Sequence, residues 1–457
     1  MTTATIERET RTADAKRDGD FFEYTKGLFD LKKVFDKPEA LKDLRVIEFG
    51  TLFLGPVTAT YLGEFGAEVI KVELPGAGDT ARSLTPWGEF WKNAALSWLS
   101  EARNKYHVAI DLHKEKGRDL FLELVSKSDV VVENMRAGAL ERKFGIGYRQ
   151  LREVNPEIIY AANSGFGQWG PYTAGRASYD AVAQAVSGLA SITGFPGHPP
   201  LKAGIWIGDY YGALMSAVSI LAAVAHRDKT GKGQFIDFSQ SENLIRALDW
   251  TWVAYGQAGK NRERYGNRDR AIVPAGVYRC EDGFVALSAL DDVQFRGLAT
   301  AMKKPGLAEE ERFSTIDSRL VEEHADALDA MIKEWTAGRN VAEVEQLGIS
   351  HGFGAAGVKK AEDHYRSAHL RERGSVWSVD DSIYGEVVEY GPIPKMSETP
   401  GRIKWAGKPV GYDNEKVLAE ILGYDYLGIK TLEEEGIIGK WSNIMGRKPP
   451  EEMLKEE

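Results

Sequence analysis

Short apolar runs alternate with helical patterns through the first half of the chain. Six of these runs are typical of buried strands, and they cover residues 44–50, 67–73, 107–112, 128–134, 156–164 and 233–239. Segments between them, such as 114–128 and 138–154, have the apolar spacing of amphipathic helices. This alternation predicts an α/β fold with a parallel, Rossmann-like sheet covered on both faces. Ligands of such sheets bind at the carboxyl ends of the strands.

The longest apolar segment covers residues 202–226. A short approach ends at Gly208-Asp209, and residues 210–225 are apolar or small on nearly every face. A run without a polar face predicts a helix buried inside the protein, and this run is too short to span a bilayer. Two interpretations of Asp209 stay open. It either caps the helix by accepting a hydrogen bond from a backbone N–H, or it is a carboxylate placed for nucleophilic attack.

The second half of the chain has a different pattern. A helix is predicted over 240–258, then a polar connector, a hairpin around Glu281-Asp282-Gly283 and mostly helical patterns to residue 368. The pattern over 407–425 returns to a loop followed by a helix. We therefore divide the chain into an N-terminal extension (1–40, with 1–20 a loosely attached arm), a large domain (41–240 with 386–457), a linker (241–270) and a small α+β domain (271–385).

The composition limits the classes of function. The net charge of −10 argues against a nucleic-acid partner or an anionic membrane surface. The single cysteine, Cys280, permits no internal disulfide and no thiolate metal cage, which suits a reducing cytoplasm. The eight histidines are scattered, so no metal site is expected. The charged N-terminus lacks the apolar core of a signal peptide and no stretch reaches membrane-spanning length, so we expect a soluble, cytoplasmic protein.

Known cofactor motifs are missing or incomplete. The chain has no GxxxxGK[ST] phosphate loop and no GxSxG elbow. Residues 76–81 fit GxGxxA directly after the second strand. A dinucleotide site needs that loop to open a helix, and the residues that follow have no helical periodicity, so no nicotinamide or flavin cofactor is expected.

A basic cluster lies along Arg103, Lys105, Arg136, Arg142 and Lys143. Such a cluster is either a solvated face or an anion site. Arg136 and Arg142 flank the end of the fourth strand and the first turns of the next helix, where backbone N–H groups also favour phosphate.

Several segments together resemble the family III CoA-transferases, a group that includes the formyl-CoA:oxalate and carnitine CoA-transferases and the related α-methylacyl-CoA racemases. The segments are RVIEFG with Gly55-Pro56 after it, GAEVIKVE with PGAGD (66–79), RNK with AIDL (103–112), VVVEN with GALER (130–142), YDAVAQAVSG (179–188) and above all Gly208-Asp209. The resemblance runs from about residue 41 to residue 423. The order and spacing of the segments carry it, because no single segment is specific.

The resemblance implies an interlocked homodimer and gives Asp209 the position of the family's nucleophile. Its carboxylate would attack the thioester of an acyl-CoA, giving an aspartyl anhydride and free CoA thiolate. The thiolate would then attack Asp209 to give an aspartyl-CoA thioester, and an acceptor carboxylate would reverse the cycle. An aspartate with a reference pKa of about 3.9 is already ionised at neutral pH, so no general base is expected. Asp180 is expected to hold a local hydrogen bond.

The resemblance also implies where coenzyme A, the acyl-CoA substrate and product, binds. Asn134, Met135, Ala139 and Arg142 would surround the nucleotide, with Ile110, Leu112 and His113 beside the adenine end. Leu74 and Tyr106 stand where some members carry arginines. Phosphate binding is therefore expected to depend on Arg142, with Lys105 supporting it.

The residues expected to contact the acyl substrates are Phe53, Tyr179 and Tyr210. Phe53 stands where some members have a glutamine, which argues against a small diacid such as oxalate. We expect succinyl-CoA as the donor and a hydrophobic or aryl-substituted acid, such as a substituted succinate, as the acceptor. Tyr179 stands at the histidine position of the racemases, and a phenol with a reference pKa near 10 is a poor proton carrier, so racemization is disfavoured. One subunit of a heteromeric CoA-transferase is the other alternative.

Overall fold

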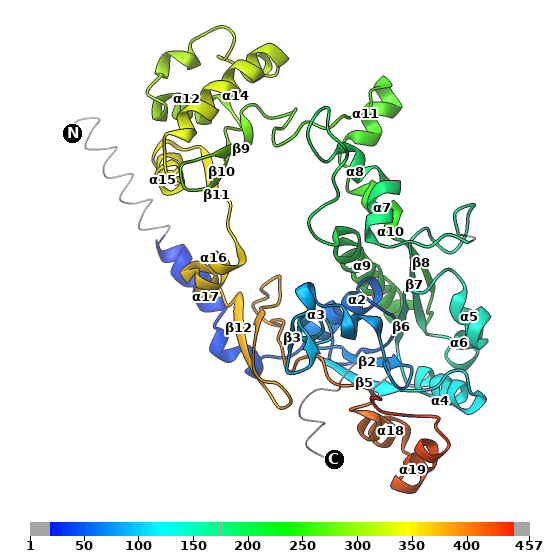
Figure 1. The fold of residues 1–457 in the computed structure, drawn as a ribbon. Helices are drawn as coiled ribbons and strands as arrows, with labels where there is room; N and C mark the ends of the chain where they lie inside the picture. The colour runs from blue at the N-terminus through cyan, green and yellow to red at the C-terminus, as the bar shows by residue number, and fades with distance from the viewer. Residues whose placement is uncertain (1–18, 174, 443–457) are drawn as a thin grey trace. The chain divides into compact units, whose positions relative to one another are not determined.

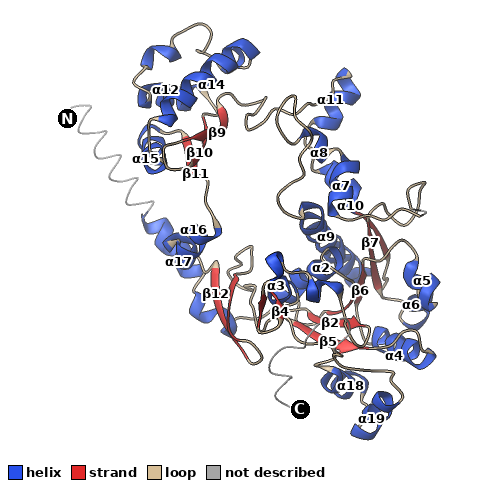
Figure 2. Cartoon of the chain, viewed as in Figure 1, coloured by secondary structure: helices blue, strands red, loops and turns tan. Residues whose placement is uncertain are grey.

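Six parallel strands lie in the order β5-β2-β1-β6-β7-β8 (Figures 1 and 2). They are β1 (Arg45–Phe49), β2 (Glu68–Glu73), β5 (Lys105–Ala109), β6 (Val130–Glu133), β7 (Ile159–Ser164) and β8 (Phe235–Ser239). The six predicted strands are thus confirmed, with small shifts at their ends. The chain order reverses between β1 and β6, as in doubly wound Rossmann sheets, so the loops after these two strands lie next to each other.

The computed structural model describes residues 19–173 and 175–442. Most of the predicted N-terminal arm and the last residues of the predicted large domain lie outside the described residues. The chain divides into two compact units. The first takes in the residues up to Ala183, Ile205–Ala247 and the residues from Leu370, and the second takes in Gln184–Gly204 and Leu248–His369. The domain boundaries drawn from the sequence stay a prediction.

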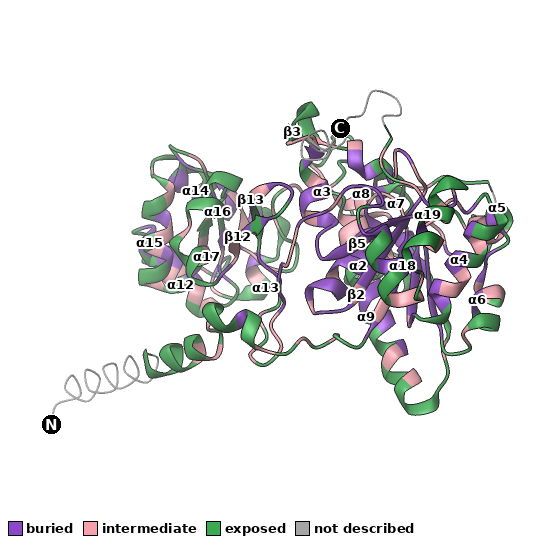
Figure 3. Cartoon of the chain, turned by 90° about the horizontal axis from the view of Figure 1, so that it is seen from below, coloured by how far each residue is buried: buried purple, intermediate pink, exposed green. Residues whose placement is uncertain are grey.

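The sheet is covered on both faces, which explains why most positions of its central strands are apolar. Val46 and Val69 pack on one face, beneath α2 (Leu54–Glu64) and α9 (Ile207–Thr230), whereas Ile47 and Ile70 pack on the other. Successive strand residues point to opposite faces, so a strand buried on both sides needs apolar residues at every position. The other face is covered by α4 (Glu115–Ser126), α5 (Ala139–Phe144), α6 (Tyr148–Val154), α18 (Asn414–Leu422) and α19 (Tyr426–Glu434). Figure 3 shows the strands buried between these layers.

Helix α9 is longer and less buried than the sequence predicts. It has 24 residues, because polar residues extend it until Gly231 ends it in the left-handed conformation. Ala213, Ala217 and Ile220 are buried, but Leu214, Val218 and Leu221 are exposed. The prediction of a helix buried on every side is therefore wrong for one face.

The length of α9 also corrects the expectation about membrane spans. Within the described residues, α9 is the one helix long and apolar enough to cross a membrane by length and composition. A core helix meets the same criterion, and α9 packs its small residues against the sheet.

The rest of the first unit surrounds the sheet. The chain before β1 contains helical residues 19–28 and the 3-10 helix η1 (Leu31–Asp36), whose Phe35 ring lies 6.2 Å from the ring of Trp377. Trp377 belongs to the antiparallel pair β12 (Val376–Asp381) and β13 (Gly385–Tyr390). The smaller elements are η2 (Thr80–Ser83), η3 (Pro86–Gly88), β3 (Phe90–Trp91), β4 (Ala94–Ala95), α3 (Leu96–Glu101), α7 (Asp180–Ser187, shared with the second unit) and α10 (Gln240–Arg246).

The second unit has its own core. β9 (Ala275–Arg279) and β10 (Phe284–Ser288) form the predicted hairpin, and β11 (Gly354–Gly357) completes an antiparallel sheet. Its apolar face packs against α12 (Asp292–Ala301), α14 (Glu322–Ala337) and α15 (Val341–His351). The remaining elements are α8 (Leu189–Ile192), α11 (Thr251–Ala258), η4 (Pro305–Ala308), α13 (Ile316–Arg319), α16 (Ala361–Arg366) and α17 (Ala368–Glu372).

Candidate active site

Asp209 is the third residue of α9 and does not occupy the N-cap position. Trp206 is the N-cap residue and makes no side-chain cap hydrogen bond. The capping acceptor comes from another helix, because Asp180 Oδ1 accepts a hydrogen bond from Gly208 N at 2.7 Å. The cap interpretation of Asp209 is therefore wrong, and the expected local hydrogen bond of Asp180 is confirmed. The Asp209 carboxylate is not needed to satisfy the helix start.

A glutamine holds the Asp209 carboxylate. Gln240 Nε2 donates to Asp209 Oδ1 at 2.7 Å, and Gln240 is the first residue of α10, directly after β8. Burial raises the pKa of Asp209 to about 7, the charge of Asp180 adds to this rise, and the hydrogen bond from Gln240 opposes it. The expectation that Asp209 is fully ionised at neutral pH is therefore corrected: its surroundings favour the neutral acid.

Aromatic rings line the start of α9. Phe53 is 3 % exposed, and its ring stacks on Trp206 with 4.4 Å between centroids. The ring of Tyr210 lies 6.2 Å from that of Phe53, and its hydroxyl donates to Glu101 Oε1 at 3.1 Å. Phe53 and Tyr210 are thus brought to the helix turn that carries Asp209. Tyr179, by contrast, is 64 % exposed beside Asp180.

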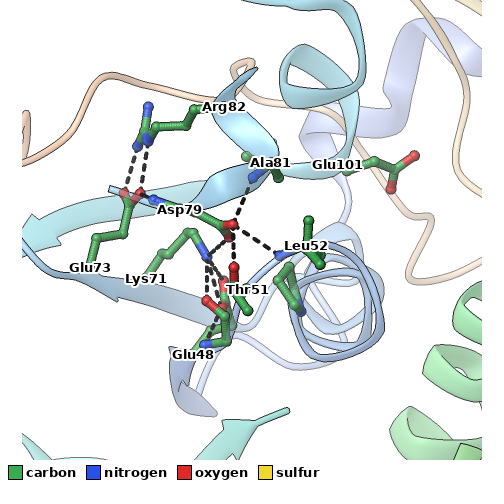
Figure 4. Close-up of polar contacts among 12 residues, drawn as sticks. Glu48, Thr51, Leu52, Lys71, Glu73, Asp79, Ala81, Arg82 and Glu101 are labelled. Carbon is green, nitrogen blue, oxygen red and sulfur yellow. Dashed lines mark hydrogen bonds and ion pairs between the residues drawn. The ribbon is translucent and has the colours of Figure 1, made fainter. Parts of the chain in front are cut away.

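A buried charge network fixes the loop that leads to Phe53 (Figure 4). Asp79 Oδ1 accepts hydrogen bonds from Thr51 Oγ1 at 2.8 Å and from Leu52 N at 2.9 Å. Leu52 has a φ of 64°, a left-handed conformation that is costly for a residue with a Cβ, so this loop needs such support. Lys71 Nζ lies 2.9 Å from Asp79 Oδ2 and 2.9 Å from Glu48 Oε1.

The GxGxxA segment belongs to this network. Asp79 caps the short 3-10 helix η2 by accepting from Ala81 N at 2.9 Å, and its own N–H donates to Glu73 Oε1 at 2.8 Å. Glu73 also binds Arg82 through two hydrogen bonds. The segment therefore holds the β1–α2 loop in place through hydrogen bonds. It leads into the 3-10 helix η2 and does not open an α-helix.

Lys105 lies inside the same network. Its side chain is 0 % exposed, and Nζ donates to Pro56 O at 2.7 Å and to Glu48 Oε2 at 3.3 Å. Burial lowers the pKa of Lys105 to about 8, against the attraction of Glu48. The structure does not bring this ammonium to the surface where Arg142 lies, because its charge is used to hold α2 and β1.

The predicted nucleotide-binding residues after β6 line an open pocket. Asn134 and Met135 form part of its wall, together with Arg136, Ala137, Ser164, Gly165, Phe166, Gly167, Thr173, Arg176 and Ser178. The buried hydroxyls of Ser164 and Ser178 have no hydrogen-bond partner among the described residues. Ala139 begins α5 and Arg142 is exposed on the same helix. The pocket thus offers two arginines and two unpaired hydroxyls at the carboxyl ends of β6 and β7.

Asn134 also has a structural role. Its side-chain amide makes two hydrogen bonds to the backbone of Thr51, each of 2.8 Å, so it ties the β6 end to the β1–α2 loop. Beneath it, Glu133 Oε2 accepts from Met135 N at 2.6 Å, and burial raises the pKa of Glu133 to about 8.

The three residues expected at the adenine end differ in their exposure to solvent. Ile110 and Leu112 are buried in the core beside the sheet, so their side chains are not presented to a ligand. His113 is exposed and contacts the edge of Phe144 in α5, with 5.2 Å between ring centroids. Only His113 of these three side chains lies at the surface near the helix of Arg142.

Sequence reasoning missed Gln240 and the network around Asp79. A polar residue directly after the sixth strand was the available signal for Gln240, because that position lies at the carboxyl edge of the sheet. For metal ions, no group of three or more His, Cys, Asp or Glu side chains within residues 19–173 and 175–442 is arranged as a site. The expectation of no metal stays a prediction.

Comparisons with known proteins agree on one family. Residues 41–414 match the family described as CoA-transferase family III. The chain is 38% identical over 400 residues to the succinyl-CoA–L-malate CoA-transferase alpha subunit of Chloroflexus aurantiacus, covering 87% of this chain and 92% of that protein. It is 35% identical over 403 residues to the succinyl-CoA–D-citramalate CoA-transferase of the same species, covering 88% and 98%. A crystal structure of a CAIB/BAIF family protein from Brucella suis matches with a TM-score of 0.73 and 29% identity, covering 84% and 99%.

Proposed function

This chain belongs to CoA-transferase family III, and we propose that it moves CoA from succinyl-CoA to a carboxylic acid of some hydrophobic bulk. A substituted succinate is our candidate acceptor. Two similar enzymes are named for succinyl-CoA with L-malate or D-citramalate, and both acids are succinates substituted at C2. The rings of Trp206 and Tyr210, with the buried Phe53 packed behind them, support an apolar substituent on the acceptor, because rings of this kind bury apolar surface well.

We propose a covalent route through Asp209. Its carboxylate oxygen attacks the thioester carbonyl of the donor, the C–S bond breaks, and an aspartyl anhydride and CoA thiolate result. The thiolate attacks Cγ of Asp209 and displaces the donor acid as a carboxylate, which leaves an aspartyl-CoA thioester. The acceptor carboxylate then takes the place of the donor acid in the reverse sequence. Each bond formed replaces one of similar reactivity, and no net proton is transferred.

Surrounding groups support this route. The hydrogen bond from Gln240 and the cap by Asp180 hold the first turn of α9 in one orientation. The stacked rings of Phe53 and Trp206 keep water from the anhydride, which water would hydrolyse.

CoA itself, in this proposal, binds along the pocket after β6 and β7. Asn134, Met135, Ala139 and Arg142 would surround the nucleotide, with His113 beside the adenine, and the pantetheine arm would pass along the wall of the pocket. The two unpaired hydroxyls, Ser164 and Ser178, offer hydrogen bonds to the amide groups of that arm. Ile110 and Leu112 would support the adenine site only from the core.

The observation that carries the proposal is the position of Asp209. It is a partly buried carboxylate in the first turn of a core helix, it does not cap that helix, and a neutral amide holds one of its oxygens. We expect the change Asp209→Ala to lower CoA transfer by about 10³-fold or more, because the covalent intermediate is lost. Steady-state assays with succinyl-CoA and a panel of C4–C10 acids measure this loss.

The control for this test is Asp228→Ala. Asp228 lies near the far end of the same helix and is exposed, so its removal changes the charge equally and should leave transfer intact. Borohydride or hydroxylamine added with succinyl-CoA should modify Asp209 in the wild-type chain. Near-full turnover of the Asp209→Ala chain, or an unmodified Asp209, would contradict the mechanism.

A heteromer is the second candidate, and the name of one relative favours it, because that protein is an alpha subunit. The resemblance favours an interlocked homodimer in the cytoplasm. Expression with a purification tag in the native host decides between them. A homologous chain of similar size that co-purifies in equal amount supports the heteromer, and a single chain supports the homodimer.

A further inference from the structure

The amide of Gln240 is the donor that the structure places on the Asp209 carboxylate. The distance from Nε2 to Oδ1 is 2.7 Å, which is short for an N–H···O hydrogen bond and typical of a charged acceptor. Gln240 is 3 % exposed, so water does not compete for this donor. The neighbouring Phe53 carries no donor. The amide therefore acts on one chosen oxygen of the carboxylate and leaves Oδ2 for bond formation.

The position of this amide is fixed from several sides. Gln240 directly follows β8, and the next residue, Ser241, donates from its N–H to Gly165 O at 3.1 Å. The glycine at position 208 lets α9 approach closely. A Cβ there would lie 3.4 Å from Gln240 Nε2 and 3.0 Å from Asp180 Oδ1. An added Cβ would crowd Asp180 Oδ1 and would only touch Gln240 Nε2, so this glycine protects the Asp180 cap and lets α9 lie in contact with the amide.

The charged groups around Asp209 make a donor valuable. Asp180 faces it from α7, and Tyr210 follows it on α9 with its hydroxyl bound to Glu101. Burial and the charge of Asp180 oppose negative charge on Asp209, and the hydrogen bond from Gln240 favours it. A negative charge that forms on Oδ1 would therefore depend on this amide.

We propose that Gln240 is a catalytic residue, the oxyanion donor for attack on the enzyme's own carbonyl group. This inference rests on the proposed function, in which Asp209 is acylated. When the CoA thiolate attacks Cγ of the anhydride, the C–S bond forms, the pair of electrons of the Cγ–Oδ1 double bond moves onto Oδ1, and the Gln240 N–H stabilises it. The double bond re-forms as the donor acid leaves as a carboxylate. No proton is transferred.

Two of the four chemical steps depend on this donor. They are the thiolate attack on Cγ of the anhydride and the acceptor attack on Cγ of the aspartyl-CoA thioester. In the other two steps the attacked carbonyl belongs to the substrate, and its oxyanion needs other donors. Loss of the Gln240 amide should therefore slow the exchange at Cγ and spare the first acylation of Asp209.

The test is the variant Gln240→Met, which keeps the length of the side chain and removes its donor. Removal of one oxyanion donor costs on the order of 10²-fold in kcat, and we expect that loss here. After rapid mixing with succinyl-CoA and an acid quench, mass spectrometry of the Asp209 peptide should find mainly the CoA adduct in wild type and mainly the succinyl adduct in Gln240→Met. The acid limb of kcat/KM should also move to higher pH.

The matched control is Asn243→Leu on the same helix. The Asn243 side-chain nitrogen is buried and has no hydrogen-bond partner among the described residues, so its loss should leave kcat and the adduct ratio unchanged. A second variant, Gln240→Leu, also removes the donor and places a shorter apolar side chain at this position. It should show the same slow exchange, and it serves if Gln240→Met does not fold.

The outcomes separate this inference from the proposed function. If Asp209 carries no adduct in wild type, the covalent route itself is wrong. If wild type carries the CoA adduct but both Gln240 variants keep wild-type kcat and the wild-type adduct ratio, the role of Gln240 alone is wrong. Equal slowing of the first acylation of Asp209 and of the exchange at Cγ would also overturn it, because a merely structural defect has that effect.

Discussion

The surroundings of Asp209 favour its neutral acid over its ionised carboxylate. Burial and the charge of Asp180 raise its pKa to about 7, and in our proposal the ionised form is the one that attacks. We expect kcat/KM for succinyl-CoA to fall about tenfold for each pH unit below 7 and to level off above it, because the ionised fraction follows that course. A pH profile between 5 and 9 measures this.

The variant Asp180→Asn tests whether the charge of Asp180 contributes to the raised pKa of Asp209. The amide oxygen can still accept from Gly208 N, but the repulsion is gone, so the acid limb should move to lower pH. A profile that is flat between pH 5 and 8 in wild type, or a limb that moves upward in the variant, would contradict this account.

At this scale the sequence predicted the position of Asp209 but not its partners. A Gly-Asp pair before an apolar run indicated an acid at a helix start. Gln240 comes 31 residues later in the chain, and only the sheet brings β8 and the start of α9 together. From the sequence we expected Lys105 to support phosphate binding. A charged residue type does not reveal that its side chain is buried, so this burial could not be predicted.

At the scale of elements, buried ion pairs hold the β1–α2 loop in its conformation. Lys71 is 0 % exposed between Glu48 and Asp79, and although burial opposes it, these carboxylates raise the pKa of Lys71. The change Lys71→Met leaves Asp79 without its ammonium and leaves Glu48 with Lys105, whose Nζ lies 3.3 Å from Glu48 Oε2. We expect a loss of about 3–5 kcal/mol in the free energy of unfolding, the cost of breaking a buried pair by removing one partner.

Urea denaturation of the two proteins measures this loss. The control Lys42→Met removes an exposed lysine before β1 and should change the free energy by less than about 0.5 kcal/mol. An equal, small effect of both changes would show that Lys71 does not stabilise the loop.

Most of the strands were predictable because they are buried on both faces. Val46 and Ile47 enter different cores, so neighbouring positions are both apolar and the run lacks the period of an amphipathic helix. The end of α9 was not predictable from its apolar run, since the helix continues through polar residues to Gly231. The left-handed conformation of Leu52 gave no signal either, because its support comes from Asp79 in a separate segment.

At the scale of the whole molecule, one apolar face of α9 is exposed to solvent in a single chain. Leu214, Val218 and Leu221 are 48 %, 50 % and 40 % exposed, and their spacing of four and three residues puts them on one stripe. We propose that the second copy in the homodimer covers this stripe. We therefore expect the change Val218→Asp to abolish the dimer, because it places a charge in an apolar interface.

Light scattering after gel filtration measures the mass. The control Thr230→Asp adds the same charge at the exposed end of α9 and should leave the dimer intact. A monomeric wild type, or a Val218→Asp chain that stays dimeric, would refute the assignment of this face.

The fold class was the most predictable property at this scale. Alternation of strands and helices indicated a parallel sheet, but it did not give the strand order. Val417 and Leu418 of α18 pack into the sheet's core from more than 300 residues beyond β5, and only the finished fold shows this contact. The partner that covers α9 could not be predicted, because the apolar pattern of one chain does not describe the surface of another chain.

The two buried lysines have a consequence for an enzyme that handles thioesters. Free amines attack thioesters and form stable amides, and an amine that loses its proton near pH 8 is well suited to do so. Lys105 has that property, yet its nitrogen and that of Lys71 are enclosed by carboxylates and backbone carbonyls. Their enclosure protects the enzyme from being acylated by its own substrate. After long incubation with succinyl-CoA, exposed lysines should carry succinyl groups while these two remain unmodified.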